Sequence, residues 1–583
     1  MMRDVHRLRT YVWRYRWRYV AGGFCLLITA TLAMSIPYLL KRAINAIEHG
    51  EPVHQVTLLA LSIVAIALVQ AVARTFSRAL IFNVGRDIEY DLRNDLFAHL
   101  QTLPPSFYRA QHTGDLMSRL VNDVTAVRML LGPAILNLVN TPIYYVYAVA
   151  IMLQLDPILT LIALLPYPIL LGVVKHYSRQ LMEQTLKVQA QLAEMSSVVQ
   201  ENLSGIHVVQ SYVAEAAETA KFAAINQRFQ DTSMRLAQVR GRMVPVMKIA
   251  ASVGTLVVLW YGGLRVVAGR LTLGDLVAFI GYLGLLAWPT MALGWMLSIL
   301  QRGRAALQRL EHIFGAVPDI DDAPDALPLP AIAGRVEFRN VDFAYHTPGN
   351  GHQVLDGISF TIEPGQQLAL VGRTGAGKST IAQLLPRLAD ATAGEILLDG
   401  RDVRQVPLRQ LRRSIGFVPQ DPFLFSDTIR ENVGFALDPI DDARVRASSA
   451  IAGISDEIEG FRHSYDQIIG ERGITLSGGQ RQRLTLARAI AADPPVLVLD
   501  DALSSVDTRT ERRILEALRD VQRGRTSIVI AHRISTIQQA DLIAVVDDGR
   551  IVELGDHETL LARDGLYAEM YRQQSLEEEL AEL

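Results

Sequence analysis

The chain has 583 residues, a single cysteine and a formal net charge of −3, and half of its residues are hydrophobic. This length predicts two or more domains, and a mean hydropathy of +0.20 is high for a soluble enzyme. The slightly acidic balance argues against a dedicated nucleic-acid-binding protein, and one cysteine, Cys25, excludes an internal disulfide. The composition therefore favours a membrane protein with at least one further domain.

Six apolar runs are long enough to cross a bilayer, which takes about 20 mostly apolar residues in a helix. They lie at roughly 19–40, 55–76, 132–154, 157–175, 244–268 and 275–300. The first run is too long for a cleaved signal peptide. Membrane helices tolerate the prolines that interrupt several runs, which are Pro37, Pro142, Pro166, Pro168 and Pro289. We therefore predict a six-helix, all-α transmembrane domain over residues 1–318.

Basic residues are distributed unevenly among the connections between these runs. The segments 1–18, 77–131 and 176–243 are basic. The remaining connections carry only Lys41, Arg42 and Arg270. Because basic residues concentrate on the cytoplasmic side of a membrane, both termini are expected in the cytoplasm. The prediction is a multi-pass protein of the cell inner membrane.

The two long cytoplasmic connections have the composition of helical continuations of the spans. The stretch PPSFYRAQHTGDLMSRLVNDV, 104–124, is broken by two prolines and Gly114, and ENLSGIHVVQSY, 201–212, is broken at Gly205. Each break predicts either a short docking helix or an ordinary loop.

Beyond the spans the sequence changes character. Residues 319–334, DIDDAPDALPLPAIAG, lack sustained periodicity and are typical of a linker. Strand-like and helix-like stretches then alternate, which predicts an α/β domain at 335–575, followed by a tail at 576–583. If this tail is helical, one face of the helix carries Leu576, Leu580 and Leu583. The tail then either contacts the tail of a partner or is a frayed acidic end.

The most specific local signal is QLALVGRTGAGKSTIAQLL, 367–385, in which a strand-like run enters a glycine-rich loop before a helix-like stretch. Glycines let the loop curl so that its N–H groups face phosphate oxygens. Lys378 is expected at the β- and γ-phosphates and the Ser379 hydroxyl on Mg²⁺. The alternative is a glycine-rich turn without a ligand. The predicted nucleotide-binding residues are Gly372, Arg373, Thr374, Gly375, Ala376, Gly377, Lys378, Ser379 and Thr380.

The stretch VLVLDDALSSVD, 496–507, supplies a partner for this loop. Its first four residues predict a second buried parallel strand, and Asp500 at the strand end is expected to hold the Mg²⁺ shell. The alternative is an aspartate that caps the next helix.

A third motif precedes the helix-like stretch RQRLTLARAI. Leu476 is followed by Ser477, Gly478, Gly479 and Gln480, so that a serine cap and two glycines build another helix N-terminus suited to an anion. With this signature between the glycine-rich loop and the Asp500 strand, the chain resembles the ATP-binding-cassette family. Six spans ahead of one cassette resemble its type IV exporter half-transporters, over essentially the whole chain.

The resemblance implies roles for the matching positions. Tyr345 is expected to stack on adenine, Gln420 to sense Mg²⁺ and the attacking water, and His532 to contact the γ-phosphate. Alone, His532 also fits a histidine at a strand end. Glu471-Arg472-Gly473 resembles the segment that communicates with the cytoplasmic helices, and Ser504 to Asp507 the loop that joins the two cassettes.

The resemblance also implies a dimer whose cassettes pack head to tail, with each ATP between one chain's loop and the other chain's signature. ATP and Mg²⁺ are the expected cofactors. The expected metal ligands are Ser379, Gln420 and Asp500, and the expected catalytic residues are Asp501, His532 and Gln420.

Asp501 departs from the family, which normally has Glu directly after the Mg²⁺ aspartate. The shorter side chain withdraws the carboxylate by roughly 1 Å, and misplacement on that scale can cost about 100-fold in rate. We therefore expect intact ATP binding but slow hydrolysis. Beside an intact signature, this pattern resembles the degenerate-site subunit of TmrAB-like heterodimers.

The predicted activity is ATP hydrolysis coupled to the export of amphipathic drugs, lipids or peptides from the cytoplasm or inner leaflet, with a homologous half-transporter as partner and no nucleic acid. The alternatives are a homodimeric exporter that uses Asp501 as its base, and an ATP-gated regulatory or channel subunit. Aromatic residues of the spans either line a substrate cavity or belong to packing and interface belts, and they include Tyr144, Tyr145, Tyr147, Trp260, Tyr261, Trp288 and Trp295.

Overall fold

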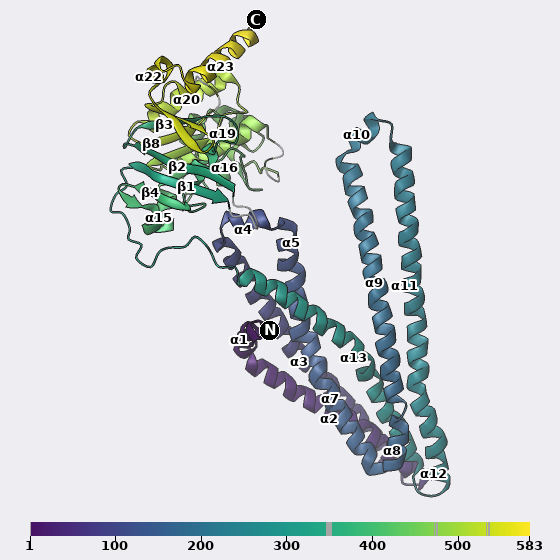
Figure 1. Cartoon of the computed structure of the whole chain (residues 1–583). Coiled ribbons are helices and arrows are strands. Elements are labelled where there is room, and N and C mark those ends of the chain that lie inside the picture. Colours follow the sequence, from purple (N-terminus) through teal and green to yellow (C-terminus); the bar gives the residue numbers. More distant parts are fainter. Residues whose placement is uncertain are drawn as a thin grey trace. The chain divides into compact units, whose positions relative to one another are not determined.

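The computed structural model describes residues 2–345, 352–470, 473, 476–531, 533 and 537–582. The chain divides into two compact units (Figure 1). The membrane unit comprises Met1–Gln101 and His112–Ala316, and the cassette unit comprises Thr102–Gln111 and Val317–Leu583. The short helix α4 (Pro105–Ala110) therefore groups with the cassette unit.

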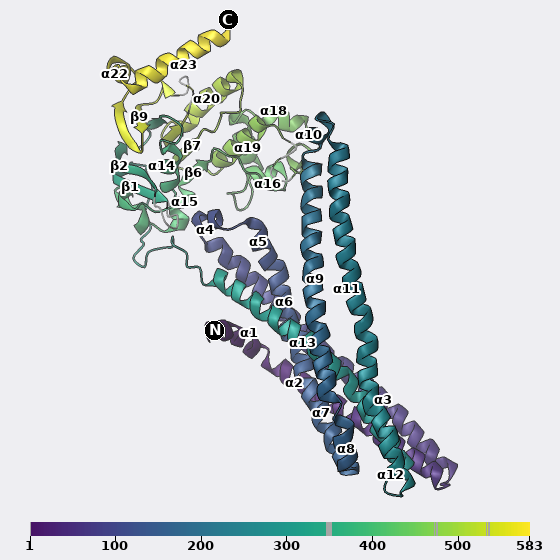
Figure 2. The same cartoon turned by 45° about the vertical axis from the view of Figure 1, so that its right-hand side comes forward.

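The membrane unit is helical. Its α-helices are α1 (Met2–Arg14), α2 (Arg16–Glu48), α3 (Val53–Thr102), α5 (Thr113–Ser118), α6 (Val124–Met129), α7 (Ile135–Leu155), α8 (Pro157–Leu164), α9 (Tyr167–Ser204), α10 (Ile206–Ser211), α11 (Glu215–Val257), α12 (Gly263–Val267) and α13 (Leu273–Phe314). Its π-helical turns are η1 (Arg119–Asp123), η2 (Leu130–Ala134) and η3 (Val258–Gly262). The long helices α9 and α11 run side by side to the short α10 that joins them (Figures 1 and 2). The prediction that the spans continue as helices is confirmed.

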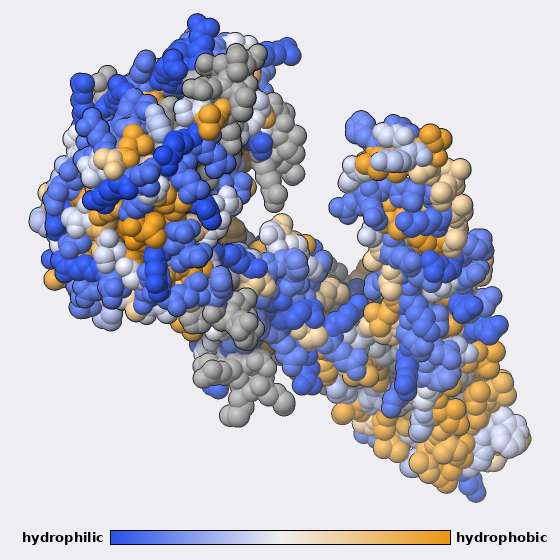
Figure 3. Space-filling view, turned by 45° about the horizontal axis from the view of Figure 1, so that its top comes forward, coloured by the Kyte–Doolittle hydropathy of each residue, from blue (hydrophilic) through white to orange (hydrophobic). Residues whose placement is uncertain are grey.

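Of the described residues, five helical stretches are long and apolar enough to cross a membrane: Arg16–Glu48, Val53–Thr102, Thr113–Leu155, Pro157–Ser204 and Leu273–Phe314. The other expected span, 244–268, falls on α11, η3 and α12, where the apolar helix Ser252–Val267 is shorter. The count of six spans therefore stays a prediction. Figure 3 shows apolar side chains gathered over one end of the membrane unit and hydrophilic ones over its helical extensions.

Local sequence signals account for the helix ends. Helix α3 ends at Thr102, before two prolines, and α4 begins with Pro105 in its first turn. Helix α9 ends at Ser204 with Gly205 as its C-cap, and α10 follows. Both breaks thus contain helices rather than plain loops, while their docking role stays a prediction. Of Glu471-Arg472-Gly473, only Gly473 lies among the described residues.

The cassette unit contains two sheets. An antiparallel sheet has the order β2-β1-β4-β5, from the strands β1 (Val336–Tyr345), β2 (His352–Ile362), β4 (Ala393–Leu398) and β5 (Arg401–Asp402). The second sheet has the order β10-β9-β3-β8-β7-β6, from the strands β3 (Gln367–Val371), β6 (Ile415–Val418), β7 (Val496–Asp500), β8 (Thr526–Ile530), β9 (Leu542–Asp547) and β10 (Arg550–Gly555). In this second sheet β3, β6, β7, β8 and β9 are parallel, and β10 pairs antiparallel with β9.

Helices surround the second sheet, whose strands β7 and β8 are buried along their whole length. Strands covered on both faces appear in a sequence as continuous apolar runs, which is why VLVL was recognisable. The helices are α14 (Lys378–Leu384), α15 (Leu408–Arg413), α16 (Ile429–Val433), α17 (Asp442–Ile451), α18 (Ser455–Gly460), α19 (Gly478–Ala491), α20 (Thr508–Gln522), α22 (His557–Ala562) and α23 (Leu566–Glu582), with the 3₁₀ turns η4 (Val403–Gln405) and η5 (Ser464–Asp466). The tail continues α23, in which Leu576 is exposed, and its contact with a partner stays a prediction.

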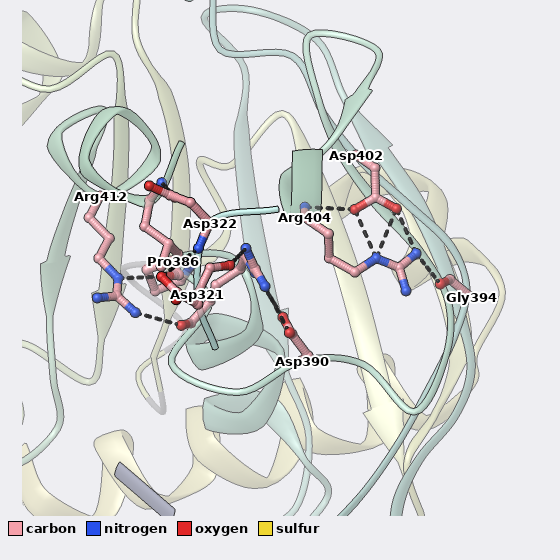
Figure 4. Close-up of polar contacts among 10 residues, drawn as sticks. Asp321, Asp322, Pro386, Asp390, Gly394, Asp402, Arg404 and Arg412 are labelled. Atoms are coloured by element: carbon pink, nitrogen blue, oxygen red, sulfur yellow. Dashed lines mark hydrogen bonds and ion pairs between the residues drawn. The ribbon is translucent and has the colours of Figure 1, made fainter. Parts of the chain in front are cut away.

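The linker 319–334 contains no helix or strand, and it is bonded to the cassette along its length. The Gln410 side chain pairs with both backbone groups of Leu329, at 2.9 and 2.6 Å. The Asp322 carboxylate accepts from the N–H of Leu408 at 2.6 Å. Figure 4 shows Asp321 and Asp322 beside Arg412, which donates to the carbonyl oxygen of Pro386 at 3.3 Å. This docking was not visible in the composition of the linker, and the predicted domain boundaries stay a prediction.

Candidate nucleotide-binding site

The topology of the second sheet brings the predicted site residues to one edge. The glycine-rich loop follows β3, Gln420 follows β6, and Asp500 ends β7, and these three strands are parallel. Loops at the carboxyl ends of parallel strands form the usual ligand-binding edge of such a sheet. A pocket of about 190 Å³ lies there, lined by Val354, Thr374, Gly375, Gly377, Lys378, Ser379, Thr380, Gln420, Asp500, Asp501 and Ile530.

Two glycines shape the loop. Gly372 has φ +150°, and a Cβ atom there would lie 2.0 Å from the carbonyl oxygen of Val546. Gly377 has φ +101° at the N-cap of α14, where a Cβ atom would lie 2.7 Å from a methyl carbon of Leu355. Only a residue without a side chain can follow this path, so the loop backbone stays close to the sheet and can turn N–H groups toward an anion.

Lys378 lies in the first turn of α14 and is only 6% exposed. Its ammonium donates to the carbonyl oxygens of Gly372 at 2.8 Å and Arg373 at 2.9 Å. Burial lowers the pKa of Lys378, against the opposing influence of Asp500 and Asp501. The ammonium is buried, and its hydrogen bonds go to carbonyl oxygens rather than to a carboxylate. Its positive charge is therefore not neutralised and can bind a phosphate group.

Ser379 and Asp500 are paired. The Ser379 hydroxyl donates to Asp500 Oδ1 at 3.1 Å, and Asp500 is 3% exposed. Among the described residues no cluster of three or more His, Cys, Asp or Glu side chains could hold a metal ion. A hydroxyl and one carboxylate, with Gln420 at the same pocket, suit Mg²⁺, which is usually bound through few protein ligands together with substrate phosphates.

Asp501 lines the same pocket on a distinctive backbone. Its φ is +48°, a left-handed conformation that Asp adopts more readily than most residues. Its N–H donates to the carbonyl oxygen of Ile530 at the end of β8, at 2.9 Å. The neighbouring strand thus holds the backbone of Asp501, and only the length of the side chain determines how far the carboxylate extends.

Tyr345, at the end of β1, lies beside the loop but does not line the pocket. Its hydroxyl is 3.3 Å from Thr380 Oγ1, and its ring meets Phe343 edge-on, with centroids 4.8 Å apart. The guanidinium carbon of Arg109 lies 4.8 Å from the Tyr345 ring centroid. Stacking of Tyr345 on adenine stays a prediction. His532, expected after β8, lies outside the described residues.

The signature residues form a separate feature at the start of α19. Ser477 is the N-cap, its hydroxyl accepting from the N–H of Gln480 at 3.2 Å. The Gln480 side chain accepts from the N–H of Ser477 at 2.9 Å, which completes a reciprocal capping box. The predicted cap is confirmed. Ser477, Gly478, Gly479 and Gln480 do not line the pocket of the glycine-rich loop.

A further residue, Gln482, was not predicted from the sequence. Its buried side chain donates to the Ser504 hydroxyl at 2.9 Å and accepts from the N–H of Ser505 at 2.8 Å. A Cβ atom on Gly479 would lie 2.9 Å from the carbonyl oxygen of Ser505, so the loop packs directly on the signature. A glutamine on the buried face of an otherwise amphipathic helix was the signal that could have identified it.

Fold and site together define a P-loop ATPase domain in one chain with a helical membrane domain. A family described as the ABC transporter transmembrane region matches residues 19–290, and one described as ABC transporter matches residues 355–504.

Known relatives cover nearly the whole chain. It is 35% identical over 566 residues to the ATP-dependent lipid A-core flippase of Syntrophus aciditrophicus, covering 97% of this chain and 93% of that protein. It is 35% identical over 572 residues to the multidrug resistance-like ATP-binding protein MdlA of Escherichia coli, covering 97% and 96%. A solved structure of a bacterial Atm1-family ABC exporter with ATP bound has a TM-score of 0.81 at 30% identity, covering 96% of this chain and 98% of that one.

The chain belongs to the ABC transporter family and is an exporter half-transporter. It binds ATP, with Mg²⁺ as the usual partner ion, and couples ATP hydrolysis to transport.

Proposed function

We propose that this chain is the slowly hydrolysing subunit of a heterodimeric, TmrAB-like exporter. Its partner is a homologous half-transporter with Glu at the position of Asp501. The observation that carries the proposal is the position of Asp501, which lines the pocket of Lys378 and Ser379 from a backbone bonded to Ile530.

The short side chain of Asp501 is the reason for slow hydrolysis. A base must lie within hydrogen-bonding reach of the nucleophilic water. Because the N–H of Asp501 is bonded to β8, the backbone cannot move forward to replace the missing methylene without breaking that bond. ATP binding is unaffected, since Lys378, Ser379 and Asp500 are all in place.

The signature of this chain serves the partner's ATP. Ser477 caps α19 in a complete capping box, and the following glycines leave the helix start unobstructed. The partner's carboxylate performs the faster hydrolysis there. The site with Asp501 stays occupied longer and holds the cassettes together.

Transport follows from the different affinity of two conformations for nucleotide. Bound ATP supplies the free energy that favours closed cassettes, and its hydrolysis removes that bias. Helices α4 and α10 are the contacts through which cassette closure reaches the membrane helices. The membrane unit then changes from inward-facing to outward-facing.

The transported compounds are amphipathic drugs, lipids or peptides taken from the cytoplasm or the inner leaflet. The names of the relatives support this range, since one is a lipid A-core flippase and another a multidrug resistance-like protein. The arginine-rich segments 1–18 and 77–131 support a location in the inner membrane with both termini in the cytoplasm.

ATP turnover by the chain purified alone in lipid tests the proposal. We expect almost no turnover from the unmodified chain and recovery when the partner is added. Asp501→Glu should raise turnover by the chain alone by about 100-fold, because it restores roughly 1 Å of reach. Asp501→Asn is the matched control and should give no increase, since the amide is not a base.

The second candidate is a homodimeric exporter in which Asp501 is the base. Brisk turnover by the unmodified chain alone, abolished by Lys378→Ala, would support it and contradict the heterodimer. An ATP-gated channel is distinguished in proteoliposomes, where only an exporter accumulates substrate against its gradient.

A further inference from the structure

A cavity lies inside the membrane unit among four of its helices. Its volume is about 250 Å³, and α2, α3, α7 and α13 contribute its lining. Two arginines one helical turn apart, Arg74 and Arg78 on α3, are part of that lining, and both side chains are exposed. No acidic residue is among the lining residues, so the cavity carries a net positive charge.

Several other cations of the membrane unit have carboxylate partners. Lys41 pairs with Asp275 at 2.6 Å, Arg309 with Asp123 at 2.5 Å, Arg128 with Glu89 at 3.2 Å, and Arg265 with Asp156. Among the residues that the structure describes, neither Arg74 nor Arg78 makes an ion pair or donates a side-chain hydrogen bond. Like charges at i and i+4 on a helix also repel each other. The pair therefore gains most from an anion that both guanidinium groups can reach.

The rest of the lining combines polar and apolar groups. Asn140 on α7 makes no side-chain hydrogen bond within the described part of the chain, so its amide is open to a ligand. Tyr144, Leu285 and Trp288 add apolar surface, and Trp288 is 71% exposed. Arginine suits carboxylate and phosphate because its planar fork can donate two parallel hydrogen bonds. The apolar side chains suit a hydrocarbon or aromatic tail.

We propose that this cavity binds the acidic headgroup of an amphipathic anion, a phosphate or carboxylate joined to an apolar tail, and that such anions are transported. The second part rests on the proposed exporter function. The volume holds a headgroup rather than a whole drug-sized molecule, for which about 300–1,000 Å³ is usual, so the tail extends out of the cavity. The headgroup belongs either to a lipid of the bilayer or to a free amphiphile.

Equilibrium binding to the full chain in phosphatidylcholine nanodiscs tests the site. The probes are radiolabelled dodecyl phosphate and dodecyl maltoside, which share a tail and differ in headgroup charge. We expect saturable binding of dodecyl phosphate that dodecyl maltoside does not displace. Equal binding of both probes would overturn the proposal.

Variants locate the binding. Arg74→Gln with Arg78→Gln should weaken dodecyl phosphate binding by about 10-fold or more, since a hydrogen bond to a charged group contributes about 1.5–3 kcal/mol. The matched control is Arg86→Gln, an exposed arginine of α3 outside the cavity lining, which should bind as the unmodified chain does. Replacing both cavity arginines by Lys keeps the charge and should retain most of the binding. Unchanged affinity in the double glutamine variant would overturn the proposal.

A change of disc lipid identifies the source of the headgroup. Competition by phosphatidylglycerol built into the disc would support a bilayer lipid as ligand, whereas no competition would support a free acidic amphiphile. The binding assay needs neither ATP nor a partner. If anion binding is absent while the dimer still moves a neutral amphiphile, this inference fails and the exporter proposal stands. If the anion binds and the dimer moves nothing, the exporter proposal fails and the anion site stands.

Discussion

The two parts of the cassette that are predicted to contact nucleotide differ in how they are built. The P-loop half consists of Lys378, Ser379, Asp500 and Asp501 around one pocket, at the ends of parallel strands. The signature half consists of the capped start of α19 and the Ser504–Asp507 loop bonded to it.

Each half depends on different contacts. In the P-loop half, the sheet holds the backbone of Asp501 in place. The proposed slow hydrolysis therefore depends on how far this one side chain extends, because Asp has one methylene fewer than Glu. In the signature half, Gln482 and Ser505 hold two segments against each other, and no residue is shortened. In the proposed heterodimer, the comparison teaches that one chain would keep its contribution to the partner's site while its own site hydrolyses ATP slowly.

The largest expected effect in the signature half comes from Gly479→Ala. The new Cβ would lie 2.9 Å from the Ser505 carbonyl oxygen, which must shift because backbone cannot rotate away. A shift on the order of 1 Å can cost about 100-fold in rate, so ATP turnover of the assembled dimer should fall by about that factor. Gly460→Ala is the control, since no atom lies within 4 Å of a Cβ built there and this glycine lies outside both halves. Equal losses from both changes would contradict the packing argument.

In the P-loop half, Lys378→Met should weaken ATP binding by this chain by about 10- to 100-fold, the loss of one hydrogen bond from a charged donor. The nucleotide-free variant should unfold at a higher temperature, because burial makes the ammonium unfavourable when no phosphate is present. A fluorescent ATP analogue and thermal unfolding measure the two effects. Lys221→Met, an exposed lysine, is the control for both. A variant that binds ATP normally would contradict the role of Lys378.

Gln482→Ala tests whether ATP turnover needs the hydrogen bonds between the Gln482 side chain and the Ser504–Asp507 loop. It leaves the N–H of Ser505 without its partner, a loss of about 1–2 kcal/mol, so turnover of the dimer should fall by about 5- to 30-fold. ATP affinity at the P-loop half should stay the same. Gln482→Glu keeps the acceptor for Ser505 and should give an intermediate turnover. An equal loss of ATP affinity would mean that the two halves are not separate.

The smallest expected effect is a pH dependence of the folding stability that comes from Glu457. Glu457 accepts from Arg483 at 2.7 Å and from Gln480 at 2.8 Å. Burial alone would raise the pKa of Glu457, and these two hydrogen bonds more than offset it, so the pKa lies below the ordinary 4.5. A lowered pKa in the folded state adds stability that is present above about pH 4.5 and is lost as the pH falls through the lowered value.

Glu457→Gln removes that dependence. Thermal unfolding of the full chain between pH 6 and 3 should show a steeper loss for the unmodified chain than for the variant, by under about 1 kcal/mol, since the carboxylate is partly exposed. Parallel curves for the two proteins would rule out a stabilising role for this ion pair.

Much of both halves could be predicted because their signals are local. The glycine-rich loop with Lys378, the strand ending at Asp500 and the Ser477 cap are each encoded by a few consecutive residues. The Ser379–Asp500 bond joins residues 121 positions apart. The sequence predicted each of the two as a Mg²⁺ ligand but did not predict the bond between them. The membrane helices were recognisable for the same local reason, since each is a long apolar run.

The sequence by itself determined the two-part organisation, the motifs and the substitution at Asp501, because strand, helix and loop preferences act over neighbouring residues. Only the tertiary structure decided that Gln482 holds Ser504 and Ser505 and that Gln410 fixes the linker. It also decided that Arg74 and Arg78 share a cavity in which the described residues offer them no carboxylate partner. These contacts join elements that are far apart in the chain, and they depend on how the helices and sheets pack rather than on any periodic pattern along them.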